Sequence, residues 1–290
     1  MNALASPRPA VAEPTSRWRR IGPILTLAVL APVYAEVLSG FTRITVIPFA
    51  LLPEIGIWGC GALLIRELVR RRGLGWRSML LLGLALAVAE EFVIQQTSLT
   101  PLAGLAREDY GRVGGVNLVY GLWALGFESV WVVMLPVQLT EVLFPSRREV
   151  PWLTARGLVV AGVVFGLASL LAWYQWTQYA RVQIFHLPPY QAPPLAIALA
   201  VLAIVLLAIL AIRLRARGEP GHRAAAGAAP PPWLVGLTAF GLALPWFLLV
   251  LLALLSWPTA SLPFWVALAG GVGWAGVAFL VADRWSRTAG

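Results

Sequence analysis

Long apolar segments alternate with short polar segments along the whole chain. Each apolar segment has about 20 residues, the length that an α-helix needs to cross roughly 30 Å of hydrocarbon. The pattern therefore predicts membrane-spanning helices. The eight predicted spans are residues 21–41, 47–66, 77–97, 116–144, 157–177, 192–212, 233–254 and 263–282.

The composition supports this interpretation. Of the 290 residues, 59% are hydrophobic and only 12% are charged, and the mean hydropathy is +0.79. A soluble domain needs a charged surface, which this chain cannot supply. We expect an all-α, polytopic transmembrane helical bundle of about eight spans. Its expected parts are a disordered cytoplasmic tail at 1–20, a six-span membrane core at 21–212, a flexible cytoplasmic linker at 213–232, and a C-terminal two-span hairpin with its tail at 233–290.

The basic residues set the expected orientation. All 22 of them are arginines, and 18 lie in the polar segments on one side of the predicted membrane. Because cytoplasmic loops carry an excess of arginine and lysine, both termini are expected in the cytoplasm. The net charge of +9 then reflects topology, and short arginine clusters between apolar segments exclude a nucleic-acid-binding module. The arginines on the outer side are Arg43, Arg107, Arg112 and Arg181.

Cysteine and histidine give little support to metal chemistry. The single Cys60 excludes an intramolecular disulfide and a multi-cysteine metal site. His186 lies in an expected external loop and His222 in the expected linker, whereas a catalytic zinc site needs histidines on ordered elements. The sequence also has no nucleotide-binding glycine loop, nucleophile elbow or HExxH motif. The sequence leaves the presence of a metal or another cofactor open.

Glutamates within the predicted spans are the main candidates for function. A charged carboxylate at the bilayer centre costs about 2.5–3.5 kcal/mol on insertion scales, so five are not expected in helices that only fill space. At about 1.5 Å of rise per residue, they lie in the outer half of the membrane or near its midplane. We expect them to converge on one polar cavity that is open to the outside. They are Glu36, Glu54, Glu90, Glu91 and Glu128.

Such a cluster constrains its own charge. Two carboxylates 4 Å apart repel by about 4 kcal/mol at an effective dielectric constant of 20, so all five cannot be charged unaided. The cluster must share protons, bind a cation, or recruit Arg43, Arg107 or Arg112 from the outer loops. The simpler alternative is that protonated glutamates only hold neighbouring helices together.

Further polar residues are expected beside these glutamates. Gln95 follows Glu91 by four positions, so both project from one helix face. Asn117 and Tyr120 share a helical stripe with Glu128 along the fourth predicted span.

A long external loop at 97–115 separates the third and fourth predicted spans. Long loops beside a polar pocket often act as lids or ligand contacts, and the glycines at its end would let it bend. The fourth span has 29 residues, so it is expected either to tilt or to break near Pro136.

Two acidic residues near the inner ends of spans have a simpler interpretation. Glu67 precedes Arg70 and Arg71 by three and four positions, which predicts a surface ion pair. Asp283 lies beside Arg284 and is expected at the membrane interface.

The stretch EEFVIQ, which begins at Glu90, resembles the EExxxR signature of the CPBP family of CAAX-protease and bacteriocin-processing membrane proteins. That resemblance implies an intramembrane hydrolase in which Glu90 and Glu91 carry the acid/base role. In such a hydrolase Glu128 is a further candidate catalytic residue. The sequence departs from the family pattern, because Gln95 replaces the arginine and Trp131 replaces the histidine of the FxxxH motif. The later HxxxN motif has no counterpart within any predicted span.

A longer region, from Gly59 to Pro145, is similar to a family of uncharacterised bacterial multi-pass membrane proteins. The shared features are GALLIRE at 61–67, the glutamate pair, YGRVGGVN at 110–117 and TEVLFP at 140–145. The resemblance implies a place in the bacterial cytoplasmic membrane and no particular activity.

Three functions fit these observations. The first is proton- or cation-coupled handling or transport of a small solute or lipid, because ionisable groups on several helices usually mark an ion path. The second is an intramembrane hydrolase, and the third is a structural subunit with a protein partner or in a homo-oligomer. The absence of histidine from every predicted span favours transport or binding over catalysis. The candidate ligand- or ion-binding residues are Glu36, Glu54, Glu90, Glu91, Gln95, Asn117, Glu128 and Arg112.

Overall fold

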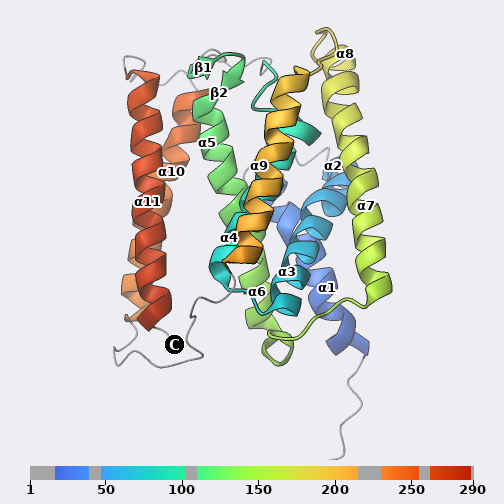
Figure 1. The fold of residues 1–290 in the computed structure, drawn as a ribbon, viewed down its shortest axis with the longest axis vertical. Helices are drawn as coiled ribbons and strands as arrows, with labels where there is room; N and C mark the ends of the chain where they lie inside the picture. The colour runs from blue at the N-terminus through green and yellow to red at the C-terminus, as the bar shows by residue number, and fades with distance from the viewer. Residues whose placement is uncertain (1–16, 39–46, 102–109, 215–229, 255–261, 289–290) are drawn as a thin grey trace, which may run out of the picture.

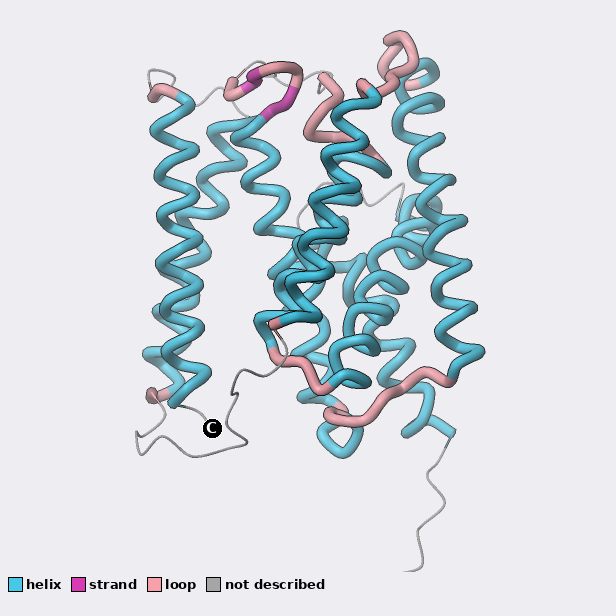
Figure 2. The backbone as a smooth tube through the Cα atoms, in the orientation of Figure 1, coloured by secondary structure: helices cyan, strands magenta, loops and turns pink. Residues whose placement is uncertain are grey.

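The computed structural model describes residues 17–38, 47–101, 110–214, 230–254 and 262–288. Within these residues the chain forms eight helical runs, which stand side by side in one bundle (Figure 1). Loops and one short hairpin connect their ends (Figure 2).

Five of the eight runs change from α- to π-helical geometry along their length. The first four runs are α1 (Arg17–Pro32) with η1 (Val33–Leu38); α2 (Ile47–Glu54) with η3 (Ile55–Gly59) and α3 (Cys60–Arg72); α4 (Trp76–Ala89) with η4 (Glu90–Ile94); and α5 (Leu118–Phe127) with η5 (Glu128–Met134) and α6 (Leu135–Leu143). The others are α7 (Ala155–Trp173) with η7 (Tyr174–Ala180) and α8 (Arg181–Gln183), then α9 (Pro194–Arg213), α10 (Pro232–Leu254) and α11 (Phe264–Thr288). A 3₁₀ turn, η6 (Pro145–Arg147), follows α6, and the strands β1 (Arg112–Val113) and β2 (Val116–Asn117) form an antiparallel hairpin.

These helices confirm the predicted all-α, polytopic membrane bundle. Among the described residues, six helical runs are long and apolar enough to cross a membrane. The other two runs, 47–72 and 76–94, carry several of the acidic and basic residues of the chain. Large apolar side chains are exposed along α7, α9, α10 and α11, as expected for surfaces that face lipid.

One boundary of the predicted elements was wrong, and the structure decides between the two alternatives that the sequence left open for the fourth span. Helix α1 begins at Arg17, so the last residues of the expected disordered tail at 1–20 are helical, while residues 1–16 lie outside the described chain. The fourth span does not break at Pro136, because it is helical from Leu118 to Leu143. The π-helical turn η5 lies just before this proline, whose ring cannot donate the usual backbone hydrogen bond. Most of the expected linker at 213–232 also lies outside the described residues.

Proline and glycine together explain one close helix contact. Pro32 has no N–H to donate to the carbonyl oxygen of Ala28, four residues earlier. Gly59 of η3 packs directly on that carbonyl, since a Cβ atom on Gly59 would lie 2.4 Å from the Ala28 oxygen. Only glycine permits α1 and η3 to approach so closely.

The chain packs around α4, which contacts α3, α5, α9 and η5. The last two helices, α10 and α11, pack on each other and on α5. There the indole N–H of Trp246 donates to the carbonyl oxygen of Trp123 over 3.2 Å. Helix α1 begins and α11 ends at the same end of the bundle, where α3 and α6 also end (Figure 1). We call this the arginine end, and the opposite end, with β1 and β2, the hairpin end.

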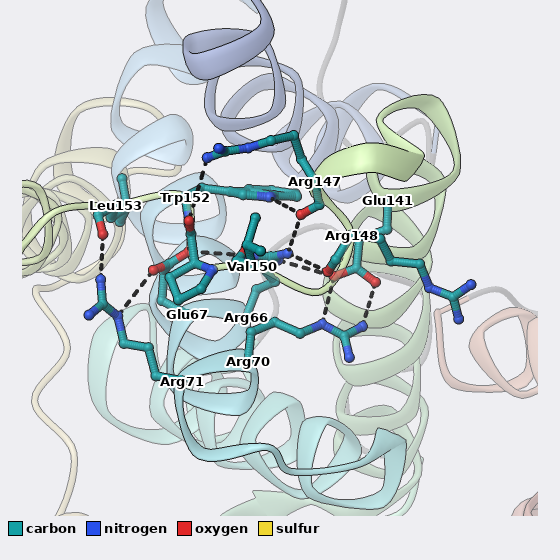
Figure 3. A network of polar contacts seen from close by, with 11 residues as sticks. Arg66, Glu67, Arg70, Arg71, Glu141, Arg147, Arg148, Val150, Trp152 and Leu153 are labelled. Atoms are coloured by element: carbon teal, nitrogen blue, oxygen red, sulfur yellow. Dashed lines mark hydrogen bonds and ion pairs between the residues drawn. The ribbon is translucent and has the colours of Figure 1, made fainter. Parts of the chain in front are cut away.

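A buried polar network, here the Arg66 network, ties α3 to α6 at the arginine end (Figure 3). Arg66 is fully buried, and each of its five N–H donors has an acceptor. Two acceptors are carboxylate oxygens, at 3.1 Å on Glu141 and 3.2 Å on Glu67. The Trp152 ring covers the guanidinium at 3.6 Å. The other acceptors are the carbonyl oxygens of Arg147, Arg148 and Val150 in the α6–α7 loop.

The predicted ion pair of Glu67 with Arg71 is confirmed, over 3.2 Å, but the surface position of Glu67 and its pairing with Arg70 were wrong. Glu67 is fully buried, and it accepts from Arg66 and Arg71 and from the backbone N–H of Trp152. Arg70 instead makes a bidentate pair with Glu141, at 2.8 and 2.5 Å. The loop that follows α6 folds back over α3, so it removes this end of the helix from solvent.

Asp283 also has a partner on a distant helix. It forms an ion pair with Arg77 at the start of α4, and its side chain is largely buried. This pair joins the end of α11 to α4 at the arginine end.

Candidate functional site

Each intramembrane glutamate lies in a π-helical turn or directly before one. Glu36 is within η1, Glu54 immediately precedes η3, Glu90 and Glu91 open η4, and Glu128 opens η5. An α-helix that widens to a π turn is rare, and such turns are frequent at functional sites. The π-helical geometry of the backbone thus marks the same residues that the free-energy cost of burying a charged carboxylate marks as candidates.

The structure brings these five residues together, and we call them the glutamate cluster. Glu90 has Glu54, Glu91 and Glu36 as electrostatic neighbours, and Glu128 has Glu91, Glu90 and Glu36. Carboxyl groups from four helical runs, which are far apart in the sequence, therefore share one region between the helices.

The glutamate cluster is enclosed by protein. Glu90 and Glu91 are each 2% exposed, Glu128 is 7% and Glu54 is 8%, whereas Glu36 is half-buried. The expected opening to the outside is thus not seen at the four buried members, and Glu36 is the most accessible one. Among the described residues, no arginine forms an ion pair with those four members.

One half of the cluster, Glu91 with Glu128, receives hydrogen bonds from the protein at Glu91, although Oε2 of Glu128 has no partner among the described residues. The hydroxyl groups of Thr97 and Ser98 donate to Oε2 of Glu91 over 2.7 and 2.6 Å. The carboxyl groups of Glu91 and Glu128 lie close enough for a hydrogen bond between them. Such a bond requires a proton on one of the two groups, because ionised carboxylates only accept. Tyr120 lies beside both glutamates and Thr97.

The other half of the cluster has few partners. The amide of Gln95, directly after η4, donates to Oε1 of Glu54 at the end of α2 over 3.3 Å. Oε2 of Glu54 and both carboxyl oxygens of Glu90 are buried and have no hydrogen-bond partner among the described residues. Unsatisfied buried oxygens are costly, so they mark a place that a ligand, a proton or water would stabilise.

The segment after η4 covers the cluster. Residues 96–100 are buried, and Gln96 adopts a positive φ of 60° that turns the chain back toward Glu91. Arg112 clamps this segment by donating to the carbonyl oxygens of Leu99 and Thr100, at 3.0 and 3.2 Å. Residues 102–109, which include Arg107, lie outside the described chain, as does Arg43.

Asn117 has a structural place at the start of α5. Its side-chain oxygen accepts from the backbone N–H of Tyr120 over 3.0 Å, which caps the helix. The backbone N–H of Asn117 donates to the carbonyl oxygen of Ser98 over 2.9 Å. Asn117 and Arg112 thus fix the covering segment.

Sequence reasoning missed Thr97 and Ser98, which supply the hydrogen bonds to Glu91. They follow Glu91 by six and seven residues, beyond the three- and four-residue spacing of one helix face. Only the reversal at Gln96 directs them back, and a positive φ at a non-glycine residue has no clear sequence signal.

The residues that a metallohydrolase would need are not assembled. Among the described residues, no group of three or more histidine, cysteine, aspartate or glutamate side chains is arranged to hold a metal ion. Trp131, which replaces the histidine of the FxxxH motif, stacks on Phe127 and contacts Phe247 of α10 edge-on. His186 lies in the loop between α8 and α9.

Comparison with known proteins identifies a family but no activity. A family model described as an uncharacterized membrane protein family matches residues 25–289. No curated protein and no solved structure matches the chain.

Proposed function

Since the chain belongs to this uncharacterised membrane protein family, its activity has to be inferred from the site, and we propose proton- or cation-coupled transport of a small solute or lipid. The glutamate cluster would carry the coupling ion. One observation carries this proposal: four buried carboxyl groups lie together without an arginine partner among the described residues. Ionisable groups inside a membrane domain usually mark an ion or proton pathway.

The closeness of the Glu91 and Glu128 carboxyl groups supports a proton as the coupling ion. In a low-dielectric region two neighbouring carboxyl groups keep one proton between them, because the ionised pair is strongly disfavoured. A change in the surroundings of the pair can then release that proton. The π turns support this role, since they widen the helices where the glutamates lie.

We also propose the orientation and the location of the protein. The arginine end faces the cytoplasm of a bacterial cell, in accordance with the distribution of arginine along the chain. The glutamate cluster then lies nearer the outer surface, below the β1–β2 hairpin.

The second candidate is an intramembrane hydrolase that uses Glu90 and Glu91, with Glu128. The free oxygens of Glu90 favour it, because a general base needs a lone pair that no hydrogen bond already occupies. The third candidate is a structural subunit whose glutamates only join helices. The transporter requires an ion to bind inside the membrane, whereas the hydrolase and the structural subunit do not.

Charge displacement on a solid-supported membrane separates them. Proteoliposomes receive a rapid pH jump or, at constant pH, a Na⁺ jump, and the transient current is recorded. Ion binding inside the membrane moves charge even when no solute is known. We expect a transient current after the pH jump in the wild type and its loss in the Glu90→Gln/Glu91→Gln variant.

The matched control is Glu149→Gln, which makes the same change in the exposed α6–α7 loop. This variant should keep the wild-type current. A current after only the Na⁺ jump would identify the coupling ion as Na⁺. No current after either jump, in correctly folded wild-type protein, would reject ion coupling and leave the hydrolase and the structural subunit.

A further inference from the structure

The two halves of the glutamate cluster differ in how their oxygens are satisfied. Glu91 receives hydrogen bonds from Thr97 and Ser98 and is paired with Glu128. Glu90 receives none on either oxygen, and Glu54 receives one, from Gln95. In the first half one buried oxygen, Oε2 of Glu128, has no partner among the described residues, whereas the second half has three such oxygens.

The second half is buried as deeply as the first. Glu90 is 2% exposed, so water outside the protein does not solvate its carboxyl group. Its strongest charged neighbour is Glu54, which makes the ionised form of both groups still less favourable. A positively charged ligand would relieve the repulsion and supply hydrogen-bond donors at the same place.

The number and type of the free atoms indicate the chemistry of this ligand. Three acceptor oxygens of this half are free, two on Glu90 and one on Glu54, and a primary ammonium group offers three N–H donors. A metal ion fits less well, since no group of three or more possible metal-ligating side chains is assembled in the described chain.

We propose that Glu54 and Glu90 bind the ammonium group of a small organic amine, which is the transported solute. This inference rests on the transport function proposed above and names its substrate class. The Glu91–Glu128 pair holds the proton, and Glu91 is adjacent to Glu90 in η4. Because two positive charges repel, arrival of an ammonium group at Glu90 favours release of that proton, so that amine binding and proton release are coupled.

Isothermal titration calorimetry on the detergent-purified full chain tests the proposal with three probes at equal ionic strength. Ethylammonium has three N–H donors, tetramethylammonium has the charge without donors, and Na⁺ is an inorganic cation. We expect ethylammonium to bind most tightly, with a proton released in weakly buffered solution. Glu90→Gln and Glu54→Gln should each weaken ethylammonium binding about tenfold or more, since each removes a charged acceptor. Glu149→Gln, in the exposed loop, should bind like the wild type.

The outcomes separate this inference from the proposed function. Equal affinity for all three probes, or no binding of ethylammonium to the wild type, overturns the amine site, and neither result depends on whether a variant folds. If a pH-jump current persists while ethylammonium does not bind, ion coupling survives and the amine site fails. If both are absent, the proposed function fails as well.

Discussion

Arg66 and Glu141 lie 75 positions apart in the sequence, yet Nε of Arg66 donates to Oε1 of Glu141 over 3.1 Å inside the protein. Both side chains are almost fully excluded from solvent. The GALLIRE and TEVLFP segments thus meet in one network at the arginine end, opposite the hairpin end. This network holds α3 against α6. These two helices belong to the helical runs that carry Glu54 and Glu128.

Replacement of Arg66 by lysine should destabilise the protein strongly. Lysine offers three donors in place of five and lacks the planar group that lies against the Trp152 ring, so buried acceptors lose their partners. We expect a loss of about 3 kcal/mol, the usual effect of breaking a buried ion pair. Unfolding in detergent, followed by tryptophan fluorescence, measures it. Arg72→Lys, an exposed change in the same helix, is the control, and equal stability of the two variants would contradict the role of the network.

Replacement of Gly59 by alanine should weaken the contact between α1 and η3. The new Cβ atom would lie 2.4 Å from the Ala28 carbonyl oxygen, so the two backbones must separate. The expected loss is about 1–3 kcal/mol, as for other overpacked sites. The matched control is Gly162→Ala in α7, where a Cβ atom meets nothing within 4 Å. If Gly59→Ala unfolds at a temperature equal to or above that of Gly162→Ala, then the contact between α1 and η3 is not tight.

Much of the architecture could be predicted from the sequence, since it follows from composition. The helical runs appear where apolar segments of about 20 residues predicted spans, because hydrocarbon leaves the backbone few alternatives to a helix. The candidate glutamates could be named for a similar reason: burying Glu90 or Glu128 is costly wherever its helix lies.

The contacts of these residues could not be predicted. Whether Arg70 pairs with Glu67 on its own helix or with Glu141 on another depends on how the α6–α7 loop folds, which no local pattern records. The hydrogen bonds to Glu91 depend on the backbone reversal at Gln96. Hydrophobic periodicity also does not reveal the π turns at the glutamates. One extra residue in a helical turn hardly changes the pattern of a uniformly apolar segment.

The proposed orientation predicts which loops a reagent can reach from outside. In a Cys60→Ala background, Val113→Cys at the hairpin end should react with a membrane-impermeant maleimide on intact cells, since Val113 is 49% exposed. Glu149→Cys in the α6–α7 loop should react only after lysis. The reverse labelling pattern would invert the topology and place the glutamate cluster near the cytoplasm.

The segment that covers the cluster should lose its fixed position when its clamp is removed. Arg112→Gln removes donors to the carbonyl oxygens of Leu99 and Thr100, so the hydroxyl groups of Thr97 and Ser98 would be held less firmly against Glu91. We expect faster amide hydrogen exchange across residues 96–100, measured by mass spectrometry. Arg156→Gln, an exposed change at the start of α7, should leave it unchanged. Unchanged exchange in Arg112→Gln would show that the covering segment is held by other contacts.

We propose that Glu91 and Glu128 share one exchangeable proton inside the membrane. Infrared spectroscopy of the protein in lipid at neutral pH tests it most directly, because a protonated carboxyl group absorbs separately from a carboxylate. We expect a protonated-carboxyl band in the wild type that shifts in D₂O. The intensity of this band should decrease in Glu91→Gln/Glu128→Gln and stay unchanged in Glu149→Gln. An unchanged band in the double variant, or no such band in the wild type, would contradict it.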